Sequence, residues 1–252
     1  MNHFIELDED DDGNQYLVVH TGSRYLGKQI ATYYQNLAYE QLTDISNEKE
    51  ELIKSLIKQG RQREIQHELK KLKKPKVNKN LAYLEDDLFW KYFEDIQRAQ
   101  IYACYNRNCI ISSILLSLDI GFTHSIETVH NYISEDFIVR KGAVYAGRGK
   151  ELLIPINMRD GILICEGKGN PDWNYSAPHG AGRICSRGKA RERFSVDEFK
   201  SEMDGIYSTC VNESTLDESP MAYKPMDEII KNIGDTVEIK KVVKPIYNFK
   251  AN

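Results

Sequence analysis

The sequence predicts an α+β fold in which mixed or antiparallel sheets are flanked by helices. Short apolar runs bounded by turn residues occupy both ends of the chain, which is typical of strands. A long, charged, leucine-bearing stretch lies between residues 26 and 117, where apolar residues recur at helical spacing. Glycines then crowd the region from 121 to 182 and separate further short apolar runs. Strands and helices that are segregated in this way define the α+β class.

The strands are predicted from composition and turn chemistry. HFIEL and QYLVVH flank the acidic turn DEDDDGN, whose Asp-Gly-Asn ending favours a hairpin. GAVYA, LLIPI and GILICEG read as further strands between residues 142 and 167, and the final segment 236–252 is also strand-like.

Helices are predicted over 26–42, over 81–117 as one helix or two, over 196–206 and over 226–232. Ser195 and Glu198 form the sequence pattern of a capping box at the start of the third. Aromatic residues at helical spacing between 83 and 105 are predicted to face a core. Residues 43–80 predict a charged helical hairpin inserted in a single domain spanning 1–252, with Gly60 at its turn. This hairpin is interpreted first as a solvated face and second as an RNA contact through its lysines.

Bulk composition narrows the class of protein. Hydrophobic residues make up 41% of the chain and charged residues 29%, as in ordinary globular proteins. The sequence has no apolar run long enough for a membrane span and no signal-peptide pattern at its acidic start. Five scattered cysteines indicate neither a zinc ribbon nor a disulfide framework, so a reducing, cytoplasmic setting is expected. The net charge of −4 does not demand nucleic acid, but local basic clusters permit an RNA partner.

Four of the six histidines, His3, His20, His130 and His179, stand beside small or amide-bearing residues. His20 precedes Thr-Gly-Ser-Arg at a strand-to-helix turn, a position that favours phosphate. His179 begins His-Gly-Ala-Gly-Arg, where glycines allow close backbone approach and Arg183 is a bidentate phosphate donor. Taken singly, each histidine is more often structural, but four such contexts together favour histidine-based phosphorus chemistry. Several imidazoles with few carboxylates suit a transition metal better than magnesium.

The chain resembles the RtcB family of RNA-splicing and RNA-repair ligases over nearly its whole length. The resemblance rests on eight stretches in the family's order: NHFIE at 2–6, VVHTGSRYLG at 18–27, EDIQRAQIYACYNRNCI at 94–110, HNY at 130–132, RKGAV at 140–144, PHGAGR at 178–183, LDESPMAYK at 216–224 and Lys250. One such stretch would be a weak match, whereas eight in order are highly specific.

The resemblance implies a GTP-dependent ligase that joins an RNA 3′-phosphate or 2′,3′-cyclic phosphate to a 5′-hydroxyl. His179 would be guanylated by GTP and pass GMP to the RNA end, with tRNA halves or broken RNA as substrates. Manganese is the implied metal, two ions per intact site, with His3, His20 and His130 as imidazole ligands. Arg24, Arg183 and Arg187 are candidates for contacting RNA phosphates. The implied GTP- and GMP-binding residues are Asn2, His3, Phe4, Ile5, Glu6, His130, Asn131, Pro155, Ile156, Asn157, Met158, Ile162, His179, Gly180, Ala181, Gly182 and Lys250.

The chain departs from the family pattern at its front, where an N-terminal region with a metal-binding aspartate and cysteine is expected. A missing segment or split partner would then supply those ligands, and this chain alone would be weakly active or inactive. In the guanylate pocket, Ile156 and Arg159 replace the family's glycines and Ile162 replaces a serine. The alternatives are therefore an RNA-binding or assembly module without catalysis, and a metal-dependent esterase that opens cyclic phosphates without GTP.

Overall fold

The computed structural model describes residues 3–250, and the chain divides into two compact units. The first unit comprises residues 1–22 and 102–252, and the second comprises residues 23–101. All the strands described belong to the first unit, and their pairing is antiparallel except between β8 and β9. The predicted α+β class is confirmed.

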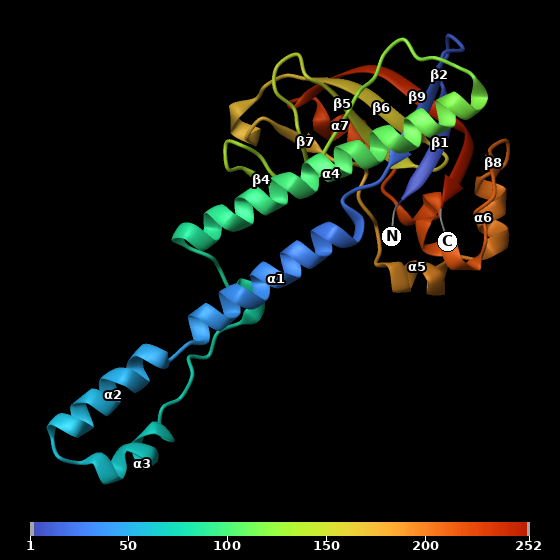
Figure 1. Ribbon diagram of the computed structural model, residues 1–252. Helices are drawn as coiled ribbons and strands as arrows, with labels where there is room; N and C mark the ends of the chain where they lie inside the picture. The colour runs from blue at the N-terminus through green and yellow to red at the C-terminus, as the bar shows by residue number, and fades with distance from the viewer. Residues whose placement is uncertain (1–2, 251–252) are drawn as a thin grey trace. The chain divides into compact units, whose positions relative to one another are not determined.

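Within residues 3–250, the larger sheet of the first unit has the strand order β2-β1-β9-β6-β5, and β8 joins it beside β9 (Figure 1). Its strands are β1 (Phe4–Glu9), β2 (Gln15–His20), β5 (Glu151–Asn157), β6 (Gly161–Gly167), β8 (Tyr207–Ser208) and β9 (Val237–Lys250). β9 pairs with β1 so that Phe4 faces Lys250, which brings the two ends of the described chain together. The hairpin predicted from the acidic turn is confirmed as β1 and β2.

A smaller sheet has the order β3-β4-β7, with β3 (His130–Ile133), β4 (Val139–Tyr145) and β7 (Ser176–Pro178). Its Val144 and Ala177 pack with Leu152, Ile154 and Leu163 of the larger sheet, and α7 (Met226–Ile233) adds Ile229 and Ile233 to the same core. β6 is buried along nearly its whole length because sheet neighbours and this core cover both of its faces. Burial of this apolar surface is the main favourable contribution to stability.

Short helices close the first unit. α5 (Arg187–Arg193) and α6 (Val196–Glu202) precede β8, and the 3-10 segments η3 (Pro171–Trp173), η4 (Glu213–Glu218) and η5 (Pro220–Ala222) lie in connecting loops. α6 ends four residues before the predicted boundary, because the chain turns at Gly205, whose φ is +83°. Phe199 and Met203 pack with Met158 and Leu216 in a separate core cluster.

The capping box predicted for α6 is present, because the Ser195 side chain accepts from the Glu198 amide and Glu198 accepts in return from the Ser195 amide. We expect Ser195→Ala to lower the free energy of unfolding by about 1 kcal/mol, since the cap satisfies amides that the helix leaves unpaired. Urea denaturation measures the effect. Ser201→Ala, at an exposed position of the same helix, is the control, and equal losses in the two variants would contradict the prediction.

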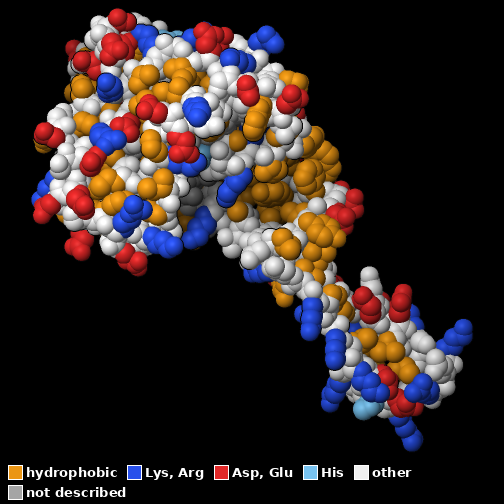
Figure 2. Space-filling model, turned by 180° about the vertical axis from the view of Figure 1, so that it is seen from behind, with side chains coloured by type: hydrophobic (Ala, Val, Ile, Leu, Met, Phe, Trp, Pro, Cys, Tyr) orange, Lys and Arg blue, Asp and Glu red, His pale blue; other side chains and the backbone are white. Residues whose placement is uncertain are grey.

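The second unit is helical. It contains α1 (Arg24–Thr43), α2 (Ser46–Lys58), the short η1 (Gln62–Glu64), α3 (Ile65–Leu69) and η2 (Lys79–Leu81). Gly60 turns the chain after α2 with φ +73°. α4 (Asp86–Leu118) begins in this unit as one continuous helix, so the second of the two readings of 81–117 is wrong. Figure 2 shows Lys and Arg side chains mixed with acidic and apolar ones on the surface of the α2–α3 segment.

The prediction that the aromatic residues of this region face a core is partly wrong. Phe89, Tyr92 and Phe93 are half-buried, but Trp90 is 53% exposed and Tyr105 is 67% exposed. Residues at adjacent helical positions point about 100° apart, so a run such as Phe89-Trp90 cannot lie on one face. No described helix is both long enough and apolar enough to cross a membrane.

Candidate active site

Three of the predicted histidines come together in a row of rings in the first unit. The ring centroids of His20 and His130 are 5.4 Å apart, and those of His130 and His179 are 4.8 Å apart. Phe4 continues the row, stacked on His20 at 5.0 Å. The row draws on four separate strand ends, because Phe4 begins β1, His20 ends β2, His130 begins β3 and His179 follows β7.

Strand pairing explains how His130 reaches His179. β4 lies between β3 and β7, so that His130 faces Val144 on one side and Pro178 faces Ala143 on the other. The register shifts at Asn131, which takes a left-handed conformation with φ +57°. Its side-chain oxygen accepts a hydrogen bond from the Gly142 amide at 2.9 Å, and the Gly142 carbonyl accepts one from the His179 amide at 3.3 Å. Asn131 and Gly142 therefore fix the backbone on both sides of the row.

The histidine rings are held in their neutral form. Burial lowers the pKa of His20 to about 4, helped by the neighbouring His130, His3, His179 and Arg107. Burial likewise lowers the pKa of His130 and of His179, although the Gly142 carbonyl opposes the shift at His179. A neutral imidazole has a free lone pair on one nitrogen, which both nucleophilic attack and metal binding require.

Sequence reasoning missed Arg107, which lies on α4 beside this row. Its guanidinium donates to the Thr21 carbonyl at 3.0 Å and pairs with Glu127. It lowers the pKa of both His20 and His130 through its positive charge. Its stretch was recognised as a family motif, but a helix position 87 residues from His20 gives no local signal of proximity.

The loop of residues 179–182, which begins with the predicted nucleophile, packs on the middle of β5. The Ala181 amide donates to the Pro155 carbonyl at 3.0 Å, and a Cβ at Gly180 would lie 2.9 Å from the same oxygen. Gly180 is therefore needed for this close approach, while Gly182 takes φ +73°. The contact places the predicted loop 179–182 against the predicted Pro155 turn region.

The other residues of that predicted turn are mostly core. The side chains of Ile156, Met158 and Ile162 are at most 3% exposed and belong to three different apolar clusters. Asn157 accepts from the amides of Arg159 and Asp160, and the positive φ falls on Gly161. Any nucleotide contact from Ile156, Met158 or Ile162 would have to come from the backbone.

Glu6 and Lys250 meet where β1 pairs with β9. Glu6 is 4% exposed, and burial together with Asp8 raises the pKa of its carboxyl, while the Lys250 charge lowers it. Ile5 points to the other face of the strand and is half-buried. His3 lies just before β1, and its charge acts on His20. The predicted Asn2 lies outside the described residues.

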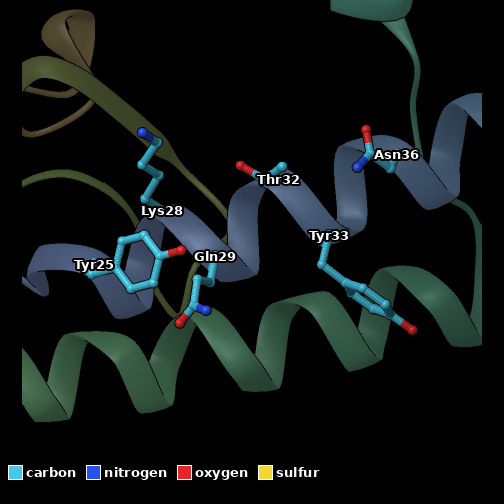
Figure 3. Close-up of a pocket in the computed structure, with 6 residues that line it drawn as sticks. All are labelled: Tyr25, Lys28, Gln29, Thr32, Tyr33 and Asn36. Carbon is cyan, nitrogen blue, oxygen red and sulfur yellow. The ribbon is translucent and has the colours of Figure 1, made fainter.

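The candidate phosphate-binding arginines differ in their surroundings. Arg183 is held by the protein, donating to the Cys185 carbonyl at 3.3 Å, to the Tyr223 hydroxyl and to the Asp217 carbonyl. Arg187 has a half-exposed side chain. Arg24 is the first residue of α1 and belongs to the second unit. An open pocket in that unit is lined only by α1 residues, none of them a predicted site residue: Tyr25, Lys28, Gln29, Thr32, Tyr33 and Asn36 (Figure 3).

The metal-binding atoms that the histidine row offers are of a type that manganese accepts. They are neutral imidazoles, and His130 Nδ1 is buried without a hydrogen-bond partner among the residues described. Between residues 3 and 250, however, no group of three or more His, Cys, Asp or Glu side chains is arranged to hold a metal ion.

A buried, neutral histidine in a glycine loop, with further imidazoles and basic groups around it, is the kind of site that histidine-based phosphorus chemistry requires. The family model described as tRNA-splicing ligase RtcB matches residues 1–251, and this chain belongs to that family. The RNA-splicing ligase RtcB of Escherichia coli K12 is 30% identical over 94% of this chain and 56% of its own length. The tRNA-splicing ligase RtcB of Nanoarchaeum equitans is 28% identical over 96% of this chain and 56% of its own length. The chain thus spans little more than half of these relatives.

Proposed function

We propose that this chain carries the guanylate-transfer site of an RNA ligase, with His179 as nucleophile. The observation that supports this most strongly is the juxtaposition of a neutral His179 ring with His130 at 4.8 Å, in a loop packed on the Pro155 carbonyl. Family membership supports the same class of reaction, since the relatives are named RNA- or tRNA-splicing ligases.

In the proposed reaction, a ring nitrogen of His179 attacks the α-phosphorus of GTP. A phosphorus–nitrogen bond forms, the α–β phosphoanhydride bond breaks, and pyrophosphate leaves with the electron pair. An RNA 3′-phosphate oxygen then attacks the same phosphorus and frees the histidine. Finally, a 5′-hydroxyl attacks the activated 3′-phosphate, loses its proton and releases GMP. A 2′,3′-cyclic phosphate is first opened by water. RNA ends from tRNA halves or broken RNA are the proposed substrates.

The chain's own residues support these steps. Asn131 and Gly142 hold the backbone of His179, and Gly180 allows the loop to pack closely against the Pro155 carbonyl. Lys250, Arg183 and Arg187 supply positive charge for the nucleotide and RNA phosphates. His3, His20 and His130 would be part of a manganese ligand set that residues 3–250 do not complete, and a bound ion would neutralise phosphate charge.

Intact-protein mass spectrometry after incubation with GTP and manganese tests the proposal. We expect one GMP adduct in the wild-type protein and none in His179→Ala, because the adduct's bond is made to that ring. His124→Ala is the matched control and keeps the adduct, since His124 is exposed and paired with Glu151. An adduct that survives in His179→Ala would contradict the assignment of the nucleophile.

A second assay separates the alternatives. Incubation with RNAs bearing a 3′-phosphate and a 5′-hydroxyl should give a joined product that requires GTP. RNA retention without adduct or joining would instead indicate a binding or assembly module. Opening of a cyclic phosphate with metal but without GTP would indicate an esterase.

A further inference from the structure

The buried carboxylate of Glu218, at the end of η4, contacts four polar side chains from separate segments. Its side chain is 7% exposed. Oε1 lies 3.3 Å from Arg187 and 3.6 Å from Arg183, while Oε2 accepts from the Tyr223 hydroxyl and lies 3.8 Å from Lys250 Nζ. Breaking such a buried pair is costly because the partner charges lose their compensation.

Two contacts fix the position of Lys250. The Glu218 carboxylate pairs with its ammonium, and its backbone belongs to β9 of the larger sheet. Its side chain is 10% exposed, so it cannot swing freely into solvent. Across the β1–β9 pair it faces Phe4, the first ring of the histidine row, and its charge also acts on the buried Glu6. The lysine ammonium therefore lies 3.8 Å from the Glu218 carboxylate of η4, and its charge also reaches the Glu6 carboxyl of β1.

Arg183 and Arg187, which pair with the same carboxylate, connect it to the nucleophile loop, residues 179–182. Arg183 follows Gly182 directly, and the Gly182 carbonyl accepts from the Lys224 amide one residue after Tyr223. Arg187 opens α5 and is also 3.7 Å from Asp217. Three cations, Arg183, Arg187 and Lys250, thus share the Glu218 carboxylate.

We propose that Glu218 is a positioning residue that holds Lys250 Nζ in place to receive the guanylate, while it anchors Arg183 behind the nucleophile loop. This inference rests on the proposed function for the identity of the ligand, but the placement of Lys250 is independent of it. Glu218 itself touches no reacting atom and acts through Lys250.

The placement is tested without ligand by acetylating the folded protein with acetic anhydride and following each lysine by peptide mass spectrometry. We expect Glu218→Gln to raise the labelling rate of Lys250 several-fold, because the amide keeps the shape but loses the charge. The matched control is Glu238→Gln on the same strand, which removes one of the two carboxylates paired with Lys240 and should leave the labelling rate of Lys250 unchanged. An unchanged Lys250 rate in folded Glu218→Gln would overturn the placement.

The functional consequence is tested with GTP and GMP as probes. We expect Glu218→Gln to weaken GMP binding and raise KM for GTP by about tenfold, with little change in kcat for guanylation. The reason is that Lys250, no longer held by Glu218, loses its charged hydrogen bond to the nucleotide. A merely structural role would instead lower kcat through a smaller folded fraction. Equal KM values in the two proteins would overturn the inference.

A second variant covers the case in which Glu218→Gln does not fold. Lys250→Met leaves the arginine contacts of Glu218 intact, and it should weaken GMP binding by a similar factor. In the double variant the two losses should not add, because Glu218 acts through Lys250; additive losses would contradict this. If the wild-type protein binds no GMP, the proposed function fails, whereas the labelling experiment still decides the placement of Lys250.

Discussion

Gly161→Ala is expected to lower the free energy of unfolding by about 4 kcal/mol or more, since both its backbone and its space forbid a side chain. Gly161 begins β6 with φ +86°, and a Cβ there would lie 1.9 Å from the Val243 carbonyl oxygen of β9. That oxygen belongs to the sheet backbone and cannot move alone. The β5–β6 turn and the neighbouring Pro155 region would shift together with it.

Urea denaturation of Gly161→Ala and Gly205→Ala separates the cost of the left-handed backbone from the cost of the contact with Val243. Gly205 has almost the same φ, +83°, but nothing lies within 4 Å of its missing Cβ. Its replacement should cost about 1 kcal/mol, the cost of a left-handed backbone conformation alone. Similar losses at the two positions would show that the contact with Val243 is not decisive.

Asp8→Asn is expected to stabilise the protein at neutral and alkaline pH. Asp8 is fully buried on β1, and neither of its oxygens has a hydrogen-bond partner among residues 3–250. It faces Pro245 on β9, which has no amide hydrogen to donate, at a point where the register shifts. Burial raises the pKa of Asp8, and the pKa of the neighbouring Glu6 is raised as well.

The sign follows from proton linkage. Because the pKa of Asp8 is higher in the folded than in the unfolded protein, the folded state binds more protons above about pH 4, and stability falls as the pH rises. Asparagine removes this titration, so the variant should gain on the order of 2 kcal/mol over wild type between pH 5 and pH 8. Asp11→Asn, at an exposed turn position, is the control. Parallel pH profiles of wild type and Asp8→Asn would refute the prediction.

The sequence predicted local secondary structure well. The β1–β2 hairpin, α1, α7, the last strand and the capping box at Ser195 all follow from signals within a few residues of one another. It left open whether residues 81–117 form one helix or two, and its prediction that the aromatic residues there face a core was partly wrong. Continuity of α4 through residues 86–118 depends on what covers the helix, and adjacent aromatics such as Phe89 and Trp90 cannot share one face.

The sequence motifs indicate His20, His130 and His179 as candidate site residues, and the structure brings their rings together. Their convergence was decided by tertiary structure. It requires β4 to lie between β3 and β7, with a shift at Asn131, and no local pattern encodes such a long-range pairing. In the larger sheet, pairing of β6 with β5 and β9 places the side chains of Ile156 and Ile162 in apolar clusters, which the sequence did not indicate.

The sequence by itself determined the family and the fold class and indicated the histidines of the candidate site, because motifs and periodicity are local and can be read without coordinates. Tertiary structure alone revealed Arg107 beside the histidine row and Glu218 beneath Lys250. Both are ordinary charged residues in the sequence, 87 and 32 positions from the groups they act on. Their roles arise from burial and distance, which the chain acquires only when it folds.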